Sequence, residues 1–183
     1  MPSTNRQVRK GRPKALASFR PAVAAGISAA VLTVSDSCSR AEKTDVSGPA
    51  VARSLIASGF RVVLTRIIPD NLLTIQNTLL DLVPQVRLVV TTGGTGVAPR
   101  DVTPEATRAV CDFLIDGIAE TMRREGAQKT PFAALSRAIC GVCGKSVVLN
   151  LPGSPKGALD SLGAVVHLIP HALDLLDGNN RHD

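Results

Sequence analysis

The residues best suited to chemistry stand in one stretch, TTGGTGVAPRDVTPEA, which spans residues 91–106. Gly93, Gly94 and Gly96 permit positive backbone angles and close approach of a ligand, so successive N–H groups can form a nest for an anion. A single tight turn would need only one or two glycines. No lysine follows Gly96 as in the nucleoside-triphosphate loop, and the G-x-G-x-x-G spacing of dinucleotide-binding loops is absent. The stretch therefore predicts a loop that holds a phosphate or a carboxylate.

Two aspartates are candidates for holding a cation beside that anion. Asp101 lies within the same stretch, and Asp70 follows another apolar segment in Ile68-Pro-Asp70. Two carboxylates beside a phosphate would repel it, but Mg²⁺ commonly binds one or two carboxylates together with substrate phosphates. The alternative is ordinary turn chemistry, because aspartate is common after proline and just before a helix. Glu105 is interpreted as a stabiliser of the first helical turn rather than a catalyst.

The elements that must position these residues are predicted from hydrophobic periodicity. Strands are expected at 29–33, 61–68, 87–90 and 146–149. Helices are expected at 49–58, at 71–82, in pieces from 103 to about 122, and from about 156 to 176 with a bend at Pro170. Ser47 and Thr103 are the expected N-caps, and Gly59 is the expected end of the first helix. Nearly continuous apolar strands alternating with helices predict a parallel sheet covered on both faces.

Every unusual polar or glycine-rich segment follows a predicted strand. These segments are Asp36, Asp70, the glycine loop and Asn150-Leu-Pro-Gly-Ser-Pro-Lys156. In open α/β sheets, ligands bind outside the carboxyl ends of the strands. We therefore expect one shared site, in which Ser154 could hold a second polar group and Lys156 could neutralise a phosphate.

The charge of the chain is concentrated at its start. The formal net charge is +6, and residues 1–26 hold six basic residues and no acid, which leaves 15 basic and 15 acidic residues elsewhere. Residues 27–183, the predicted folded domain, therefore lack the basic footprint of a nucleic-acid-binding core. Residues 1–26 are interpreted as a disordered tail. A secretory signal ending near Val34 would remove the first strand, and an organelle transit peptide is the other alternative.

Cysteine and histidine spacings suggest weaker alternatives. Cys140-Gly-Val-Cys143 has the spacing of a metal or redox pair, but no second pair accompanies it, so both are interpreted as small apolar residues beside a buried strand. His167, His171 and Asp174 could share a helix face and bind a metal, although partly exposed helix positions are the ordinary interpretation. No apolar run reaches the roughly 18–20 residues of a membrane helix, and a reduced cytoplasmic setting is expected.

Taken together, the motifs resemble those of the MogA/MoaB family of molybdenum-cofactor biosynthesis proteins, the molybdopterin adenylyltransferases, which also occur as gephyrin-like G domains. The matching pieces, in family order over about residues 28–178, are Ser35-Asp-Ser37, Asp45-Val-Ser-Gly-Pro49, Ile68-Pro-Asp70, Thr91-Thr-Gly-Gly-Thr-Gly96, Arg100-Asp-Val-Thr-Pro-Glu-Ala106, Leu135-Ser-Arg137 and Asn150-Leu-Pro-Gly-Ser154. The resemblance implies a three-layer α/β/α sandwich, usually a homotrimer, that transfers AMP from Mg-ATP to the terminal phosphate of molybdopterin and releases pyrophosphate.

The resemblance also implies roles for particular residues. It places catalysis and Mg²⁺ binding on Asp70 and Asp101. The substrate-binding residues it implies are Asp36, Ser37, Thr92, Gly93, Gly94, Thr95, Gly96, Ser136, Arg137, Pro152, Gly153, Ser154 and Lys156. Some members carry a basic residue where Cys143 stands, and Lys145 lies two positions further on. A metal-insertion protein is the expected receiver of the product, and no membrane partner is expected.

Two other function classes remain open at this point. A non-catalytic carrier or scaffold of the same family would keep the glycine loop, but it would have no need of paired acids beside ATP. A nucleic-acid or surface adaptor would depend on the basic tail, and the neutral remainder with its few aromatic residues counts against it.

Overall fold

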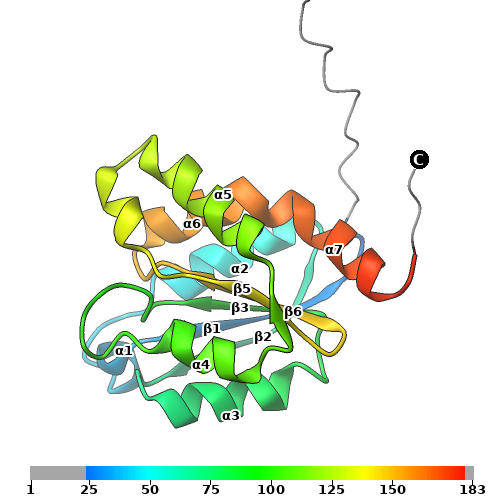
Figure 1. The fold of residues 1–183 in the computed structure, drawn as a ribbon. Coiled ribbons are helices and arrows are strands. Elements are labelled where there is room, and N and C mark those ends of the chain that lie inside the picture. Colours follow the sequence, from blue (N-terminus) through cyan, green and yellow to red (C-terminus); the bar gives the residue numbers. More distant parts are fainter. Residues whose placement is uncertain (1–23, 180–183) are drawn as a thin grey trace, which may run out of the picture.

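A six-stranded sheet in the order β2-β1-β3-β6-β5-β4 lies between two layers of helices (Figure 1). The computed structural model describes residues 24–179. The strands are β1 (Ser28–Val34), β2 (Arg61–Ile68), β3 (Leu88–Thr92), β4 (Phe113–Leu114), β5 (Cys140–Cys143) and β6 (Ser146–Leu151). The helices are α1 (Asp36–Ser39), α2 (Ser47–Ala57), α3 (Leu72–Leu82), α4 (Thr103–Val110), α5 (Asp116–Ala127), α6 (Pro155–Val165) and α7 (Ile169–Leu176), with 3₁₀ helices η1 (Pro131–Leu135) and η2 (Val166–Leu168).

Four neighbouring strands, β2, β1, β3 and β6, run parallel. Most residues of the edge strand β2 are exposed, whereas β1, β3 and β6 are buried on both faces, as β1 illustrates. Ala29 and Val31 belong to the core under one helical layer, whereas Ala30 and Leu32 belong to the core under the other. This two-sided burial is what the continuous apolar runs predicted. The predicted fold class, a mostly parallel sheet in a three-layer α/β/α sandwich, is confirmed.

The other two strands were not predicted, and they pair differently. β5 runs antiparallel to β6, and β4 runs antiparallel to β5. The expected helical stretch from 103 to about 122 is consequently interrupted by β4, and α5 continues to Ala127. Cys140 and Cys143 are the first and last residues of β5, and they pair with Leu149 and Ser146 of the buried strand β6, so their interpretation as small residues beside a buried strand is confirmed.

The helices are divided between the two faces of the sheet (Figure 1). Apolar side chains of α2, α5, α6 and α7 fill one core, whereas those of α3 and α4 fill the other. On α3, for example, Ile75, Leu79 and Leu82 are buried at helical spacing against the sheet. The helices leave one edge of the sheet open to loops, the edge at which the parallel strands end.

Two helix starts differ from the predictions because tertiary contacts compete for the capping side chains. Ser47 lies inside α2, and Asp45 provides the cap instead, since its Oδ1 accepts the N–H of Gly48 at 3.0 Å. Thr103 is the first residue of α4, and its hydroxyl donates to the carbonyl oxygen of Gly93 at 3.0 Å. The Thr103 hydroxyl thus fastens the glycine loop, whereas the Ser47 hydroxyl donates to Asp45 Oδ1 at 3.3 Å.

The last helix is divided into two by the 3₁₀ turn η2. Pro170, which was expected to bend it, stands at the start of α7 and has no N–H for an α-helical bond to Val166. By length and composition the stretch Pro155–Leu176 could cross a membrane, with a mean hydropathy of 1.3. Leu162, Val165 and Ile169 within it are fully buried in the core, so packing against the sheet accounts for its apolar face.

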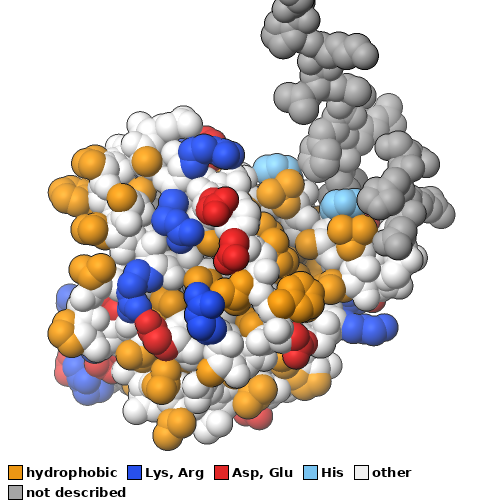
Figure 2. All heavy atoms as spheres, viewed as in Figure 1, with side chains coloured by type: hydrophobic (Ala, Val, Ile, Leu, Met, Phe, Trp, Pro, Cys, Tyr) orange, Lys and Arg blue, Asp and Glu red, His pale blue; other side chains and the backbone are white. Residues whose placement is uncertain are grey.

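Residues 24–26, assigned above to the tail, are packed on the fold. Ala24 is 2% exposed, and the N–H of Gly26 donates to the carbonyl oxygen of Gly59 at 3.1 Å. The predicted disorder of residues 1–23 lies outside the described residues. On the face shown in Figure 2, acidic and basic side chains are interspersed rather than gathered by sign.

Candidate active site

The ends of β1 and β2 bring two aspartates together. The N–H of Asp36 donates to Asp70 Oδ2 at 2.8 Å, and the N–H of Asp70 donates to Asp36 Oδ1 at 3.0 Å. Each carboxylate thus fixes the backbone of the other residue. This reciprocal pair holds the Asp70 side chain at the open edge of the sheet, where sequence reasoning placed it.

The glycine loop that follows β3 fits tightly between the ends of β1 and β6. A Cβ at Gly93, whose φ is +107°, would lie 2.2 Å from the carbonyl oxygen of Val34. A Cβ at Gly153 would lie 3.2 Å from the Cα of Gly93, and Thr92 Oγ1 donates to the carbonyl oxygen of Pro152 at 2.7 Å. The predicted convergence of the four segments at one edge is therefore observed.

The loop backbone also lies against both acids. A Cβ at Gly94, with φ +62°, would meet Thr103 Oγ1 at 2.3 Å and Asp70 Oδ1 at 3.1 Å. A Cβ at Gly96 would lie 2.9 Å from Asp101 Oδ2. Only glycine leaves room at these points, so the two carboxylates flank the same short piece of chain from different strand ends.

Electrostatics at this edge favour the binding of a cation. Burial raises the pKa of Asp70, the N–H of Asp36 opposes that rise, and the negative charges of Asp36 and Asp101 add to it. Arg100 lowers the same pKa and lies 4.0 Å from Asp36. A carboxylate whose ionised form is disfavoured by its neighbours gains from a bound cation, so oxygen ligands for a hard metal are available here.

Two cavities open on either side of the loop and share Gly94, Asp101 and Gly153. The larger cavity, of about 420 Å³, lies under α5, η1 and the start of α6. The acidic cavity, of about 360 Å³, is lined by residues that include Asp45, Asp70, Arg100 and Asp101. A group bound in one cavity can therefore meet a group bound in the other at the glycine loop.

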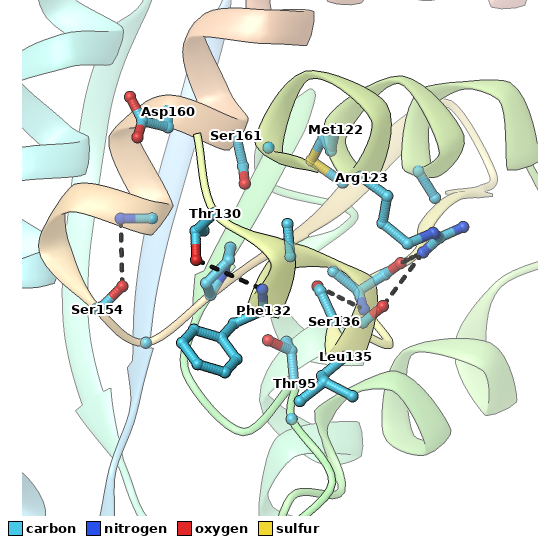
Figure 3. A pocket seen from close by; sticks show the side chains of 18 of the residues that line it. Thr95, Met122, Arg123, Thr130, Phe132, Leu135, Ser136, Ser154, Asp160 and Ser161 are labelled. Carbon is cyan, nitrogen blue, oxygen red and sulfur yellow. Dashed lines mark hydrogen bonds between the residues drawn. The ribbon is translucent and has the colours of Figure 1, made fainter. Parts of the chain in front are cut away.

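Both apolar and polar side chains line the larger cavity (Figure 3). Phe132 and Leu135 come from η1 and Met122 from α5, whereas Ser154 is the N-cap of α6 and Ser161 lies within that helix. Phe132 is 75% exposed. The combination suits a planar heterocycle, because an aromatic ring can stack on it while hydroxyl groups bond its edge.

The Arg137 guanidinium braces the loop. Its Nε donates to the carbonyl oxygen of Gly96 at 2.6 Å, its Nη2 donates to the carbonyl oxygen of Asp101, and its Nη1 pairs with Glu105. The N–H of Arg137 also donates to the carbonyl oxygen of Thr95 at 2.9 Å. The Arg137 side chain is therefore hydrogen-bonded within the protein, and it lines neither cavity.

The residues predicted from the sequence divide into two groups. Those that line a cavity are Asp70, Thr92, Gly93, Gly94, Thr95, Gly96, Asp101, Ser136, Pro152, Gly153 and Ser154. Those that line neither are Asp36, Ser37, Arg137 and Lys156. The first group consists of the loop and its surroundings, whereas Asp36 is hydrogen-bonded to Asp70 and Arg137 is hydrogen-bonded to the loop.

Several lining residues were not predicted as site residues. They include Thr33, Asp45, Ser47, Arg100, Arg123, Lys129, Phe132 and Asp160. Asp45 and Arg100 belong to motifs that carry the family resemblance, so the sequence pointed to both residues, although no site role was predicted for either. Phe132 and Asp160 follow no motif, and only the packing of η1 and α6 brings them to the cavity.

The cysteines form no metal group. Among residues 24–179, no three His, Cys, Asp or Glu side chains are grouped so as to hold a metal ion. Burial raises the pKa of Cys111 and of Cys140 to about 12, and it also raises the pKa of Cys143. These thiols are protonated at neutral pH, which makes them poor ligands and poor nucleophiles.

Fold and candidate site together define an α/β domain with two neighbouring cavities at the carboxyl ends of its parallel strands. Residues 30–171 match the model of a probable molybdopterin binding domain. The chain belongs to this family, and the membership inferred from its motifs is confirmed.

Individual relatives agree with the family match. The chain is 39% identical over 153 residues to a molybdopterin adenylyltransferase of Helicobacter pylori, covering 81% of this chain and 87% of the relative. It is 41% identical over 150 residues to the Drosophila melanogaster molybdenum cofactor synthesis protein cinnamon, covering 80% of this chain but only 25% of that protein. The structure of the molybdopterin biosynthesis enzyme MoaB from Thermus thermophilus is similar with a TM-score of 0.78 and 45% identity, covering 83% of this chain and 97% of that one.

Proposed function

We propose that this protein acts in molybdenum cofactor biosynthesis and transfers AMP from Mg-ATP to the terminal phosphate of molybdopterin. The observation that carries the proposal is the position of Asp70 and Asp101 against one glycine loop, with both acids lining the acidic cavity and Asp101 lining the larger cavity as well. The name of the Helicobacter pylori relative supports the same reaction. Paired acids beside such a loop suit an enzyme that joins two phosphorylated substrates.

The reaction requires alignment and charge neutralisation more than proton transfer. A terminal phosphate oxygen of molybdopterin attacks the α-phosphorus of ATP, and pyrophosphate leaves with the electron pair of the broken P–O bond. The attacking phosphate is already ionised, so a strong base is not needed. The N–H groups of Gly94, Thr95 and Gly96 would hold the phosphate oxygens between the cavities, whereas the N–H of Gly93 already donates to the carbonyl oxygen of Leu151 at 3.1 Å.

Asp70 and Asp101 are the residues that would hold Mg²⁺. Their oxygen ligands fit this metal, and a divalent cation would offset both the burial and the neighbouring negative charges that raise the pKa of Asp70. Bound there, Mg²⁺ supplies positive charge to the phosphates of ATP. Asp36 keeps Asp70 in position, and Arg137 keeps the backbone of Asp101 in position.

The two cavities differ in what they suit. The acidic cavity suits the metal-bound phosphates, because Asp70 and Asp101 both line it. The larger cavity suits the planar ring of a substrate, because Phe132, Leu135 and Met122 line it. Gly94 and Gly153 belong to both, so the reacting phosphates would meet beside these glycines.

A mass-spectrometric assay tests this proposal. The full chain is incubated with molybdopterin and Mg-ATP, and adenylylated molybdopterin is measured for wild type, Asp101→Asn and the control Asp81→Asn, whose side chain is exposed on α3. We expect Mg²⁺-dependent product, a loss of about 10²-fold or more in Asp101→Asn, and no change in the control. Tight pterin binding without product would identify a carrier instead. Full activity and unchanged Mg²⁺ dependence in Asp101→Asn would refute the role of that residue.

The assembly and setting are part of the same proposal. Homotrimer formation is tested by light scattering of the purified chain, where a mass of one or two chains would refute it. We place the reaction in the reducing cytoplasm, since Cys38, Cys111, Cys140 and Cys143 are free thiols. A metal-insertion protein would then receive the adenylylated product.

A further inference from the structure

The acidic cavity contains an excess of negative charge with one basic residue to offset it. Asp45, Asp70 and Asp101 line it, and Arg100 is the single Lys or Arg among the lining residues. Asp45 is already satisfied by the Thr33 hydroxyl at 2.6 Å and by the N–H of Gly48 at 3.0 Å. The cation at Arg100 is therefore the group in this wall that can attract an anion directly.

The Arg100 guanidinium is free to do so. Its only ion pair within the described residues is with Asp36 Oδ2 at 4.0 Å, and its side chain is 72% exposed. The guanidinium of Arg137, by contrast, already donates to two backbone carbonyl oxygens and pairs with Glu105. An exposed pair at 4.0 Å is weak, so releasing Arg100 from Asp36 costs little.

The proposed reaction creates a need for such a cation. As the bond from the molybdopterin phosphate to the α-phosphorus forms, the bond from the α-phosphorus to the bridging oxygen breaks. The electron pair of the broken bond goes to pyrophosphate, whose negative charge therefore grows in the transition state. A guanidinium binds such oxygens in a bidentate fork and stabilises the charge where it develops.

Resting on the proposed function, we propose that Arg100 is a catalytic residue that binds the β- and γ-phosphates of ATP and stabilises the departing pyrophosphate. The residue directly precedes Asp101, so the cation and the candidate metal ligand are carried by one short segment. That segment is fastened by the bond from the N–H of Ala98 to Asp101 Oδ2 at 2.9 Å and by the brace from Arg137. Arg100 thus extends into solvent from a fixed base.

Three variants of the full chain test this role. Arg100→Gln removes the charge, Arg100→Lys keeps the charge without the fork, and Arg108→Gln is the control, an exposed arginine of α4 that lines neither cavity. We expect kcat for AMP transfer to fall about 10²-fold in Arg100→Gln and less in Arg100→Lys. Molybdopterin binding should stay unchanged in all three, because the ring occupies the larger cavity.

Binding of Mg-pyrophosphate, measured by calorimetry without pterin, separates this inference from the proposed function. Weaker pyrophosphate binding in Arg100→Gln, with Arg108→Gln like wild type, supports the role. Equal pyrophosphate binding and equal kcat in wild type and Arg100→Gln would overturn it and leave Arg100 as a partner of Asp36 only. If wild type forms no adenylylated product, the proposed function fails, and the pyrophosphate comparison still decides whether Arg100 binds phosphates.

Discussion

Replacing Gly93 by alanine is the most direct test of how the candidate site is built. Gly93 has a φ of +107°, and an added Cβ would lie 2.2 Å from the carbonyl oxygen and 3.2 Å from the carbonyl carbon of Val34. Both atoms are backbone of β1, which is paired with β2 on one side and β3 on the other. Neither the loop nor the strand can therefore yield without breaking sheet hydrogen bonds.

The expected cost is the sum of two effects. A non-glycine residue at this φ costs about 1–3 kcal/mol of backbone strain. Forcing a methyl group into a filled space costs about 1–3 kcal/mol more. Gly93→Ala should therefore lower the free energy of unfolding by about 2–6 kcal/mol, a large share of the 5–15 kcal/mol that typical domains possess.

Two other glycines separate these effects. Gly144 has a φ of +58° and no atom within 4 Å of an added Cβ, so Gly144→Ala should show strain alone, about 1–2 kcal/mol. Gly163 lies inside α6 with no atom within 4 Å of an added Cβ, so Gly163→Ala should stabilise by about 0.5–1 kcal/mol. Urea unfolding of the three variants measures the series.

The ranking of the free energies of unfolding shows whether the close approach of Gly93 to Val34 constrains the loop. Gly163→Ala should be the most stable, followed by wild type, Gly144→Ala and Gly93→Ala. If Gly93→Ala proves no less stable than Gly144→Ala, the loop can move away from β1. The close approach at Val34 would then not be a constraint on the site.

Three further predictions concern other parts of the molecule. Arg137→Gln should lower the free energy of unfolding by about 2–4 kcal/mol, because bonds from a charged donor to two loop carbonyls are lost; unchanged urea unfolding would contradict the brace. Burial raises the pKa of Asp70 in the folded state above the usual 3.8. The free energy of unfolding therefore falls as pH rises from 3.8 through the folded-state pKa, where the carboxyl group ionises in its buried position. Asp70→Asn should therefore raise the urea midpoint at neutral pH without Mg²⁺, and the gain should vanish as pH falls below 3.8; a gain that persists there would refute the cause. Cys140, which is fully buried and has a pKa of about 12, should react with thiol reagents near pH 8 only after denaturation, and its rapid labelling in the native protein, seen by mass spectrometry, would contradict its burial.

The central strands β1, β3 and β6 were predictable because their apolar residues are buried on both faces of the sheet. Strand β2 was predicted with the bounds it has in the structure, Arg61–Ile68. Strands β4 and β5 escaped prediction for local reasons. β4 has two residues, and β5 contains Gly141 and two cysteines in place of a β-branched run. Gly144 was the signal in the sequence for the hairpin of β5 and β6, because a two-residue hairpin turn needs a residue with positive φ, and Gly144 has a φ of +58°.

The site was predictable where it follows from topology. The carboxyl ends of parallel strands must meet, so Asp70, Asp101 and the glycine loop could be placed together from their positions after strands. The walls of the larger cavity could not be placed, because Phe132 and Asp160 reach it through the packing of η1 and α6. The hydroxyl of Thr103 illustrates the limit, since a local capping rule cannot anticipate a tertiary partner such as Gly93.

The linkage of the site through distant segments has a consequence for folding. The hydrogen bonds that define it join residues 34 apart at Asp36 and Asp70, 41 apart at Arg137 and Gly96, and 60 apart at Thr92 and Pro152. Each closes a long loop, whose entropy must be lost before the contact contributes. A partly folded chain can possess β1, β2 and their helices, but it cannot possess the site. Recovery of ligand binding after dilution from urea should therefore lag behind recovery of helical signal, which makes binding a measure of completed folding.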